Sequence, residues 1–106
     1  MSRVVIAAFR PKPGKAQVQR QVVQRHGTVL AEQGLVTDRP RIVMQAADGT
    51  LIEVFEWRSA EAVEQAHANP AVQALWREFE AACEYVPVGA VAEAGRLFSE
   101  FAPVDV

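Results

Sequence analysis

The distribution of apolar and polar residues predicts that this chain begins with a strand. The first apolar run, RVVIAAFR (residues 3–10), is rich in β-branched residues and is apolar on both alternations. This pattern is typical of a strand that is covered on both faces. The following PKPG (residues 11–14) ends the strand, because proline cannot donate to a sheet ladder and glycine turns the chain.

Residues 15–34 predict an amphipathic helix, because apolar residues recur at three- and four-residue steps between glutamine and arginine. At about 100° per residue, His26 falls inside the apolar stripe. Gly27 is a weak point in this helix, costing about 1 kcal/mol relative to alanine. Gly34 suits the C-terminal cap. The predicted stripe consists of Val18, Val22, Val29 and Leu30.

A β-hairpin is predicted next. RIVMQA (41–46) and LIEVFEW (51–57) read as strands, and Asp48-Gly49 between them is a strong turn signal. Alternation along the second strand separates its side chains into two mainly apolar sets, so both faces are expected to be covered. Leu51, Glu53, Phe55 and Trp57 form one set, and Ile52, Val54 and Glu56 form the other.

A second helical region follows, in two segments. Ser59 is expected to cap the first segment, while Asn69 caps a second whose first turn accepts Pro70. The helix is expected to end at EYVP (84–87), and a loop or short turn to precede a last strand at RLFSEFAPV (96–104). The helix faces consist of Ala60, Val63, Ala66 and His67 in the first segment, and Val72, Leu75, Trp76, Phe79 and Cys83 in the second.

The resulting order, β-α-β-β-α-β, predicts an α+β domain of the split, ferredoxin-like plan. We expect one domain spanning residues 1–106, with a four-stranded antiparallel sheet and two helices on one of its faces. Because the strands are apolar on both sides, something must cover the open face. In a chain this short, the simplest cover is a second copy of the same sheet, so the pattern predicts a homodimer.

Composition narrows the function classes. The chain has 106 residues and a net charge of −2, and no basic run marks a nucleic-acid surface. A single cysteine, Cys83, excludes an internal disulfide and CxxC metal sites, and fits a reducing compartment. The apolar run at residues 4–9 is too short for a signal peptide or a membrane span. We therefore expect a cytoplasmic protein without nucleic-acid or membrane partners.

Three polar residues are candidates for catalysis. His67 could act as a general base, because imidazoles exchange protons near neutral pH, or it could bond carbonyls freed near the helix break. His26 could line a cavity together with His67, or serve as a hydrogen-bonded core group. Glu53 lies on a covered face and needs a partner, for which Arg41 is a candidate. Alternatively, Glu53 could be a base with a raised pKa. Glu56 points to the opposite face and should not pair with Glu53.

Other chemistry receives little support. Neither histidine has the close spacing to Glu53 or Glu56 of a dedicated metal-ligand motif, so no metal is expected. Cys83 lies on an apolar stripe and is expected to be buried and inert. Phosphate-binding, dinucleotide-binding and nucleophile-elbow motifs are absent.

Nearly the whole chain resembles the dimeric α+β barrel superfamily, and within it the antibiotic-biosynthesis-monooxygenase-like domains. The resemblance rests on a first strand that runs into a Pro/Gly turn (VVIAAFRPKPGK), and on a strand that ends in FEWRS after the Asp-Gly hairpin. It also rests on the Ala-His pair in AEAVEQAH and on the proline-started NPAVQALWREFE. This resemblance implies a homodimer that closes an α+β barrel through its open sheet faces.

The same resemblance implies a pocket between helices and sheet, where we expect Trp57, Val63, Trp76 and Phe79 as lining residues. Haem-degrading relatives carry Asn, Trp and His at positions that read Ala7, Ala66 and Trp76 here, so haem degradation is disfavoured. Two functions remain open. One is a dimeric protein that binds a small aromatic ligand without a cofactor, and the other is a cofactor-independent monooxygenase acting on an aromatic, quinol or polyketide-like compound.

Overall fold

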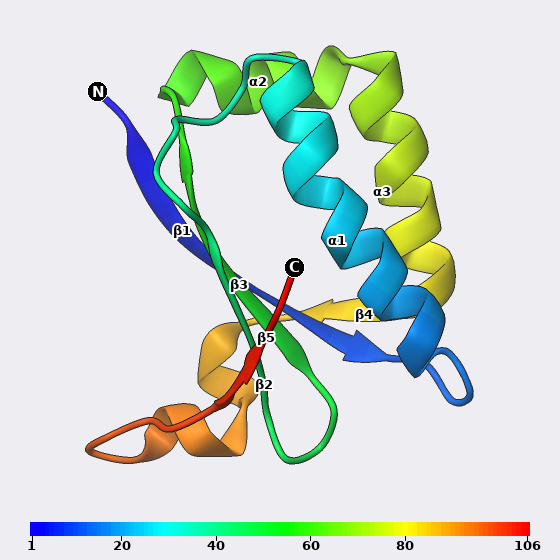
Figure 1. Ribbon diagram of the computed structural model, residues 1–106, viewed down its shortest axis with the longest axis vertical. Helices are drawn as coiled ribbons and strands as arrows, with labels where there is room; N and C mark the ends of the chain where they lie inside the picture. Colours follow the sequence, from blue (N-terminus) through cyan, green and yellow to red (C-terminus); the bar gives the residue numbers. More distant parts are fainter.

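The computed structural model describes residues 1–106 as an α+β fold with one antiparallel sheet (Figure 1). The sheet has five strands in the order β4-β1-β3-β2-β5. The expectation of four strands was therefore wrong, because a short edge strand joins β2. The strands are β1 (Arg3–Pro11), β2 (Ile42–Gln45), β3 (Leu51–Trp57), β4 (Cys83–Val86) and β5 (Ala102–Val104).

Three α-helices, rather than two, lie together on one side of the sheet (Figure 1). Ser59 caps the second helix by accepting a hydrogen bond from the Ala62 N–H at 3.1 Å. Asn69 caps the third by accepting from Ala71 and Val72, with Pro70 in the first turn. The predicted break is therefore a boundary between two separate helices. The helices are α1 (Ala16–Glu32), α2 (Ala60–Ala68) and α3 (Pro70–Ala82).

The end of the chain differs from its prediction. The strand after the helices begins directly at Cys83 and pairs with β1, whereas residues 84–87 were expected only to end a helix. Of the strand predicted at 96–104, only β5 forms. Two short 3-10 turns, η1 (Val88–Ala90) and η2 (Ala92–Gly95), connect these strands.

Strand register determines which side chains face the helices. β1 and β3 pair so that Phe9 lies opposite Leu51, and Ala7 opposite Glu53. Helix α1 covers this face, although its buried stripe differs from the prediction: Val18 is 43% exposed. The next residue, Gln19, is buried instead, and its side-chain amide donates a hydrogen bond to the Phe9 carbonyl.

The other face of the sheet is covered at one end only. Val91, on the chain segment between the two 3-10 turns, packs against Ala8 and Ile52 there. At the opposite end, Val4, Ile6 and Ile42 are 60%, 54% and 58% exposed. An apolar surface therefore remains open on the side of the sheet away from the helices. No helix in the structure is both long and apolar enough to cross a membrane.

Candidate functional site

A cavity of about 510 Å³ lies between the helices and the sheet. Most of its lining is apolar or aromatic, which is the usual character of a small-molecule site. We call it the aromatic cavity. Its lining residues are Val5, Ala7, Phe9, His26, Phe55, Trp57, His67, Trp76, Phe79, Glu80 and Tyr85.

His26 is the buried polar group in the wall of this cavity. Helix α1 presents it among the rings of Phe55 and Phe79, which lie edge-on at centroid distances of 5.4 and 5.1 Å. Its Nδ1 lies 2.7 Å from Oε1 of Glu53. Its other ring nitrogen, Nε2, has no hydrogen-bond partner in the protein. Protein atoms do not enclose this nitrogen completely. Nε2 is therefore the atom that His26 offers to the cavity.

Glu53 lies behind His26, with only 1% of its surface exposed. Arg41 donates from Nη1 to Oε2 of Glu53 at 2.7 Å, so the predicted partner is the observed one. Burial alone would raise the pKa of Glu53, but the hydrogen bonds from His26 and Arg41 outweigh burial and lower that pKa below its ordinary value. Glu53 is thus held as a carboxylate, which disfavours a base with a raised pKa.

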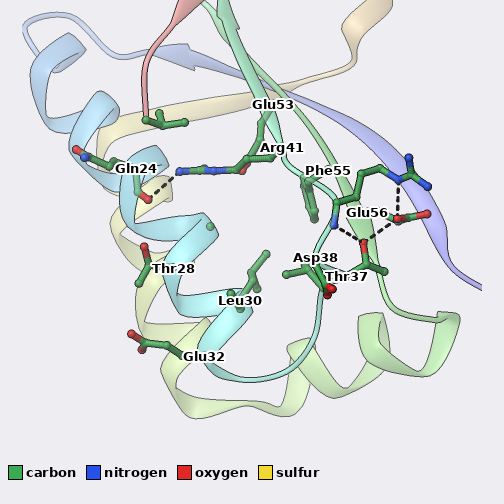
Figure 2. A pocket seen from close by; sticks show the side chains of 15 residues that line it. Gln24, Thr28, Leu30, Glu32, Thr37, Asp38, Arg41, Glu53, Phe55 and Glu56 are labelled. Atoms are coloured by element: carbon green, nitrogen blue, oxygen red, sulfur yellow. Dashed lines mark hydrogen bonds and ion pairs between the residues drawn. The ribbon is translucent and has the colours of Figure 1, made fainter.

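The Arg41 side chain extends from the residue before β2 toward helix α1 (Figure 2). Its guanidinium also donates to the carbonyls of Val23 at 2.7 Å and Gln24 at 2.9 Å. A Cβ atom placed on Gly27 would lie 2.5 Å from the Arg41 Nε, which is too close for a side chain. The glycine that reads as a weak point in the helix is therefore the position where the arginine passes.

The Arg41 side of Glu53 faces a second cavity of about 600 Å³, drawn in Figure 2. Its lining combines apolar and polar residues, and Thr28, Glu32 and Asp38 contribute polar side chains. We call it the polar cavity. Glu53 lines this cavity and does not line the aromatic one, so this candidate for catalysis lies behind the wall of the aromatic cavity. Phe55 lines both cavities, whereas Glu53 lines only the polar one and His26 only the aromatic one.

His67 lies at the exposed edge of the aromatic cavity, near the end of α2. Its Nδ1 donates to the Val63 carbonyl at 2.8 Å, one helical turn earlier. Its ring lies 5.0 Å from that of Trp76, edge-on. The structural interpretation of His67, a bond to a helix carbonyl, is therefore observed. His67 nevertheless lines the aromatic cavity, so it remains a candidate for contact with a ligand.

The predicted lining of the pocket is recovered except at one position. Trp57, Trp76 and Phe79 line the aromatic cavity, whereas Val63, on α2, is partly buried against a core cluster and does not. Tyr85 was not predicted. It lies opposite Phe9 in the β1–β4 pairing, which carries it to the cavity, and burial raises the pKa of its hydroxyl to about 12. Only a correct prediction of β4 could have found it.

Glu56 forms a separate polar cluster on the other face of β3. It accepts hydrogen bonds from Thr37 and Ser2, both at 2.7 Å, and from the Arg39 Nε at 2.8 Å. The bond from Thr37 is the largest cause that lowers the pKa of Glu56 to about 2, and Arg39 and Ser2 act in the same direction. As expected, Glu56 makes no pair with Glu53.

Two further groups limit the chemistry. Cys83 is 2% exposed and donates to the Phe79 carbonyl at 3.1 Å, and burial raises the pKa of its thiol to about 11. It is therefore a poor nucleophile near neutral pH. No three histidine, cysteine, aspartate or glutamate side chains gather closely enough to hold a metal ion.

Comparison with known proteins supports the fold and no more. Neither the family models nor the curated proteins include a significant match to this chain. Among solved structures, the chain is similar to Rv0793 from Mycobacterium tuberculosis, with a TM-score of 0.66 and 19% sequence identity. The match covers 81% of this chain and 89% of that one. At this identity, the likeness shows a shared α+β fold, and says nothing about activity.

Proposed function

We propose that this protein is a homodimeric small-molecule-binding protein of the monooxygenase-like α+β barrel type, without a cofactor. Strands β4-β1-β3-β2 follow the order of the ferredoxin-like plan, to which β5 is an addition. One observation carries the binding proposal: a largely apolar cavity into which a single buried nitrogen, Nε2 of His26, presents an unused hydrogen-bonding site. Such a site suits a flat aromatic molecule with one polar group.

A thermal-shift screen with phenols, quinols and polyketide-like aromatics tests this proposal. A ligand at about 100 times its dissociation constant adds about 2.7 kcal/mol to the free energy of unfolding. The substitution Ala7→Leu should weaken binding, because Ala7 lines the cavity and leucine would fill part of it. Ala74→Leu, at an exposed position of α3, is the matched control. Equal binding by both variants would place the ligand elsewhere.

The dimer is supported by the open end of the sheet. Val4, Ile6 and Ile42 leave an exposed apolar surface, which small soluble proteins usually cover with a partner. Sedimentation should show a dimer that Ile6→Glu dissociates, whereas Val18→Glu, at an exposed valine on α1, leaves it intact. A wild-type monomer at micromolar concentration would exclude this part of the proposal.

A second function, cofactor-independent oxygenation, is favoured by the contact between His26 and Glu53. A histidine oriented by a carboxylate is the usual arrangement of a general base. Nε2 could take the proton of an aromatic hydroxyl, giving a phenolate that reacts more readily with oxygen. Oxygen uptake with purified protein and substrate, lost in His26→Gln while binding persists, would support it. No uptake with any bound phenol would leave binding alone.

A further inference from the structure

The two cavities are connected by a continuous line of three charged or polar side chains. Arg41 lies at the polar cavity and bonds one oxygen of Glu53, while the other oxygen of Glu53 bonds His26. Side chains of Glu53 and His26 are 1% and 5% exposed, and that of Arg41 is 17% exposed. The line therefore joins a partly solvated cation to the wall of the aromatic cavity.

With Arg41 in place, the hydrogen positions along this line are determined. The guanidinium balances the charge of Glu53, so the carboxylate stays ionised and can only accept hydrogen bonds. Nδ1 of His26 must then carry the hydrogen that it shares with Glu53. In a neutral imidazole the second nitrogen is consequently unprotonated. When the imidazole is neutral, Nε2 therefore faces the aromatic cavity as a hydrogen-bond acceptor.

Loss of Arg41 would reverse this polarity. A buried carboxylate without a cation is costly, so the pair of Glu53 and His26 would bind one more proton. If the carboxyl group held it, that group would donate to Nδ1, and the imidazole hydrogen would move to Nε2. If the imidazole held it, both nitrogens would carry hydrogen. In both cases Nε2 becomes a donor.

We propose that Arg41 is a positioning residue that determines specificity: from the polar cavity it makes Nε2 of His26 an acceptor, so that the aromatic cavity selects ligands that donate a hydrogen bond. The ligand-selecting half of this inference rests on the binding function proposed above. It assigns a role to a side chain that does not line the cavity whose ligand it selects.

No neighbouring cation is placed to replace Arg41. Arg39 also lines the polar cavity, but its Nε is bonded to Glu56 on the other face of β3. The other charged or titratable groups that line the two cavities make no hydrogen bond to His26 or Glu53. These groups are Glu32, Asp38 and Glu56 at the polar cavity, and His67, Glu80 and Tyr85 at the aromatic cavity.

Gly27 offers an independent way to disturb Arg41. Alanine at this position favours a helix by about 1 kcal/mol over glycine. Its Cβ would nevertheless lie 2.5 Å from the Arg41 Nε, so the arginine must move away from its present path. Gly27→Ala therefore displaces the guanidinium without removing it. Gly89→Ala is the matched control, because nothing lies within 4 Å of a Cβ there.

Nitrogen-15 NMR of the imidazole at slightly alkaline pH tests the polarity directly. A His67→Gln background leaves His26 as the single histidine of the chain. The parent protein should show Nδ1–H with an unprotonated Nε2. Arg41→Met should show Nε2–H, Arg41→Lys should retain the parent pattern, and Gly27→Ala should shift toward Arg41→Met. Gly89→Ala should match the parent.

Two NMR outcomes would overturn the inference: a parent protein with hydrogen on Nε2, or an Arg41→Met variant that keeps Nε2 unprotonated. If Arg41→Met does not fold, the parent spectrum and Gly27→Ala decide the matter, because alanine favours the helix. A merely structural role for Arg41 would lower stability without moving the imidazole hydrogen.

Binding of a matched pair of probes tests ligand selection. The probes are 2-naphthol, which donates a hydrogen bond, and 2-acetylnaphthalene, which only accepts. Quenching of Trp57 and Trp76, which line the cavity, reports binding. We expect wild type to prefer 2-naphthol by about tenfold, the equivalent of one hydrogen bond, and Arg41→Met to reverse the preference. An unchanged preference would refute the selecting role. If neither probe binds wild type, the proposed function and this selecting role both fail, while NMR still decides whether Arg41 controls the imidazole.

Discussion

Glu53 and Glu56 are three positions apart on one strand and differ in almost everything else. Glu53 faces the helices and is held by His26 and Arg41, both distant in sequence and both turned inward. Glu56 faces the other way and collects bonds from the N-terminal segment and from the loop before β2. Both carboxyl groups have a lowered pKa.

The difference shows that a lowered pKa does not by itself identify a functional carboxylate. Around Glu56, two hydroxyl groups and a largely exposed arginine tie the N-terminal segment and the loop before β2 to the sheet, which is a structural task. Around Glu53, each oxygen leads to a different cavity. The candidate site differs because the two partners of Glu53, Arg41 and His26, line two different cavities. Four predictions test this contrast.

Glu53→Ala should have the largest effect, a loss of about 3–5 kcal/mol in the free energy of unfolding. It leaves the partly solvated Arg41 guanidinium without its counter-charge and the buried His26 without its partner, and removing one partner of a largely buried pair costs about this amount. Urea denaturation measures the loss. Glu56→Ala is the comparison and should cost clearly less, because its partners can turn to water. Equal losses would remove the contrast.

His26→Phe should cost about 2 kcal/mol, because Glu53 loses one charge-assisted hydrogen bond while Arg41 still neutralises it. The aromatic packing around position 26 should persist. Urea denaturation gives the free energy, and a loss as large as that of Glu53→Ala would mean that Arg41 alone does not satisfy the buried Glu53 carboxylate.

Glu56 should make stability depend on pH in the acid range. Its folded-state pKa of about 2 lies below its ordinary value of 4.5, so the unfolded chain binds protons more readily. The contribution is complete above about pH 4.5 and is lost as pH falls toward about pH 2. Denaturant titrations across this window should show a shallower decline for Glu56→Gln than for wild type. Parallel declines would mean that another group carries the effect.

Arg25→Met should have the smallest effect, about 0.3 kcal/mol. Arg25 and Glu78 form two hydrogen bonds of 3.0 and 2.7 Å, but both side chains are about half exposed, at 51% and 47%. Exposed pairs contribute little and are screened by salt. Denaturation should show this difference in stability between the variant and wild type at low salt, and no difference in molar salt. A loss comparable to that of Glu53→Ala would mean that geometry outweighs burial here.

Much of the architecture was predictable from periodicity. The alternation in β3 correctly placed Glu53 and Glu56 on opposite faces of the strand, and Ser59 and Asn69 mark helix starts by their chemistry. The end of the chain was not predictable in this way. Cys83 continues the helical stripe of α3 although it begins β4, because pairing with β1 overrides local periodicity. Leu97 and Phe98 imitate a strand but are 92% and 79% exposed.

The candidate site was predictable only in part. The pairing of Arg41 with Glu53 follows from neighbouring strands, whereas the bond from Glu53 to His26 depends on how closely α1 approaches the sheet. That approach is a property of tertiary packing and leaves no mark in local sequence. Gly27 illustrates the same limit. Helix propensity predicts that this glycine lowers helix stability, but it cannot predict that the Arg41 side chain lies against it.

The enclosed thiol of Cys83 has a practical consequence for labelling. Because it is the single cysteine of the chain, and its pKa is raised to about 11, maleimide reagents should leave it untouched in the folded protein at neutral pH. A cysteine introduced at Val18, an exposed position on α1 outside the proposed dimer surface, would then be the one reactive site. Spin labels attached there would test the proposed dimer through the distance between two labels, with no need to remove the native cysteine first.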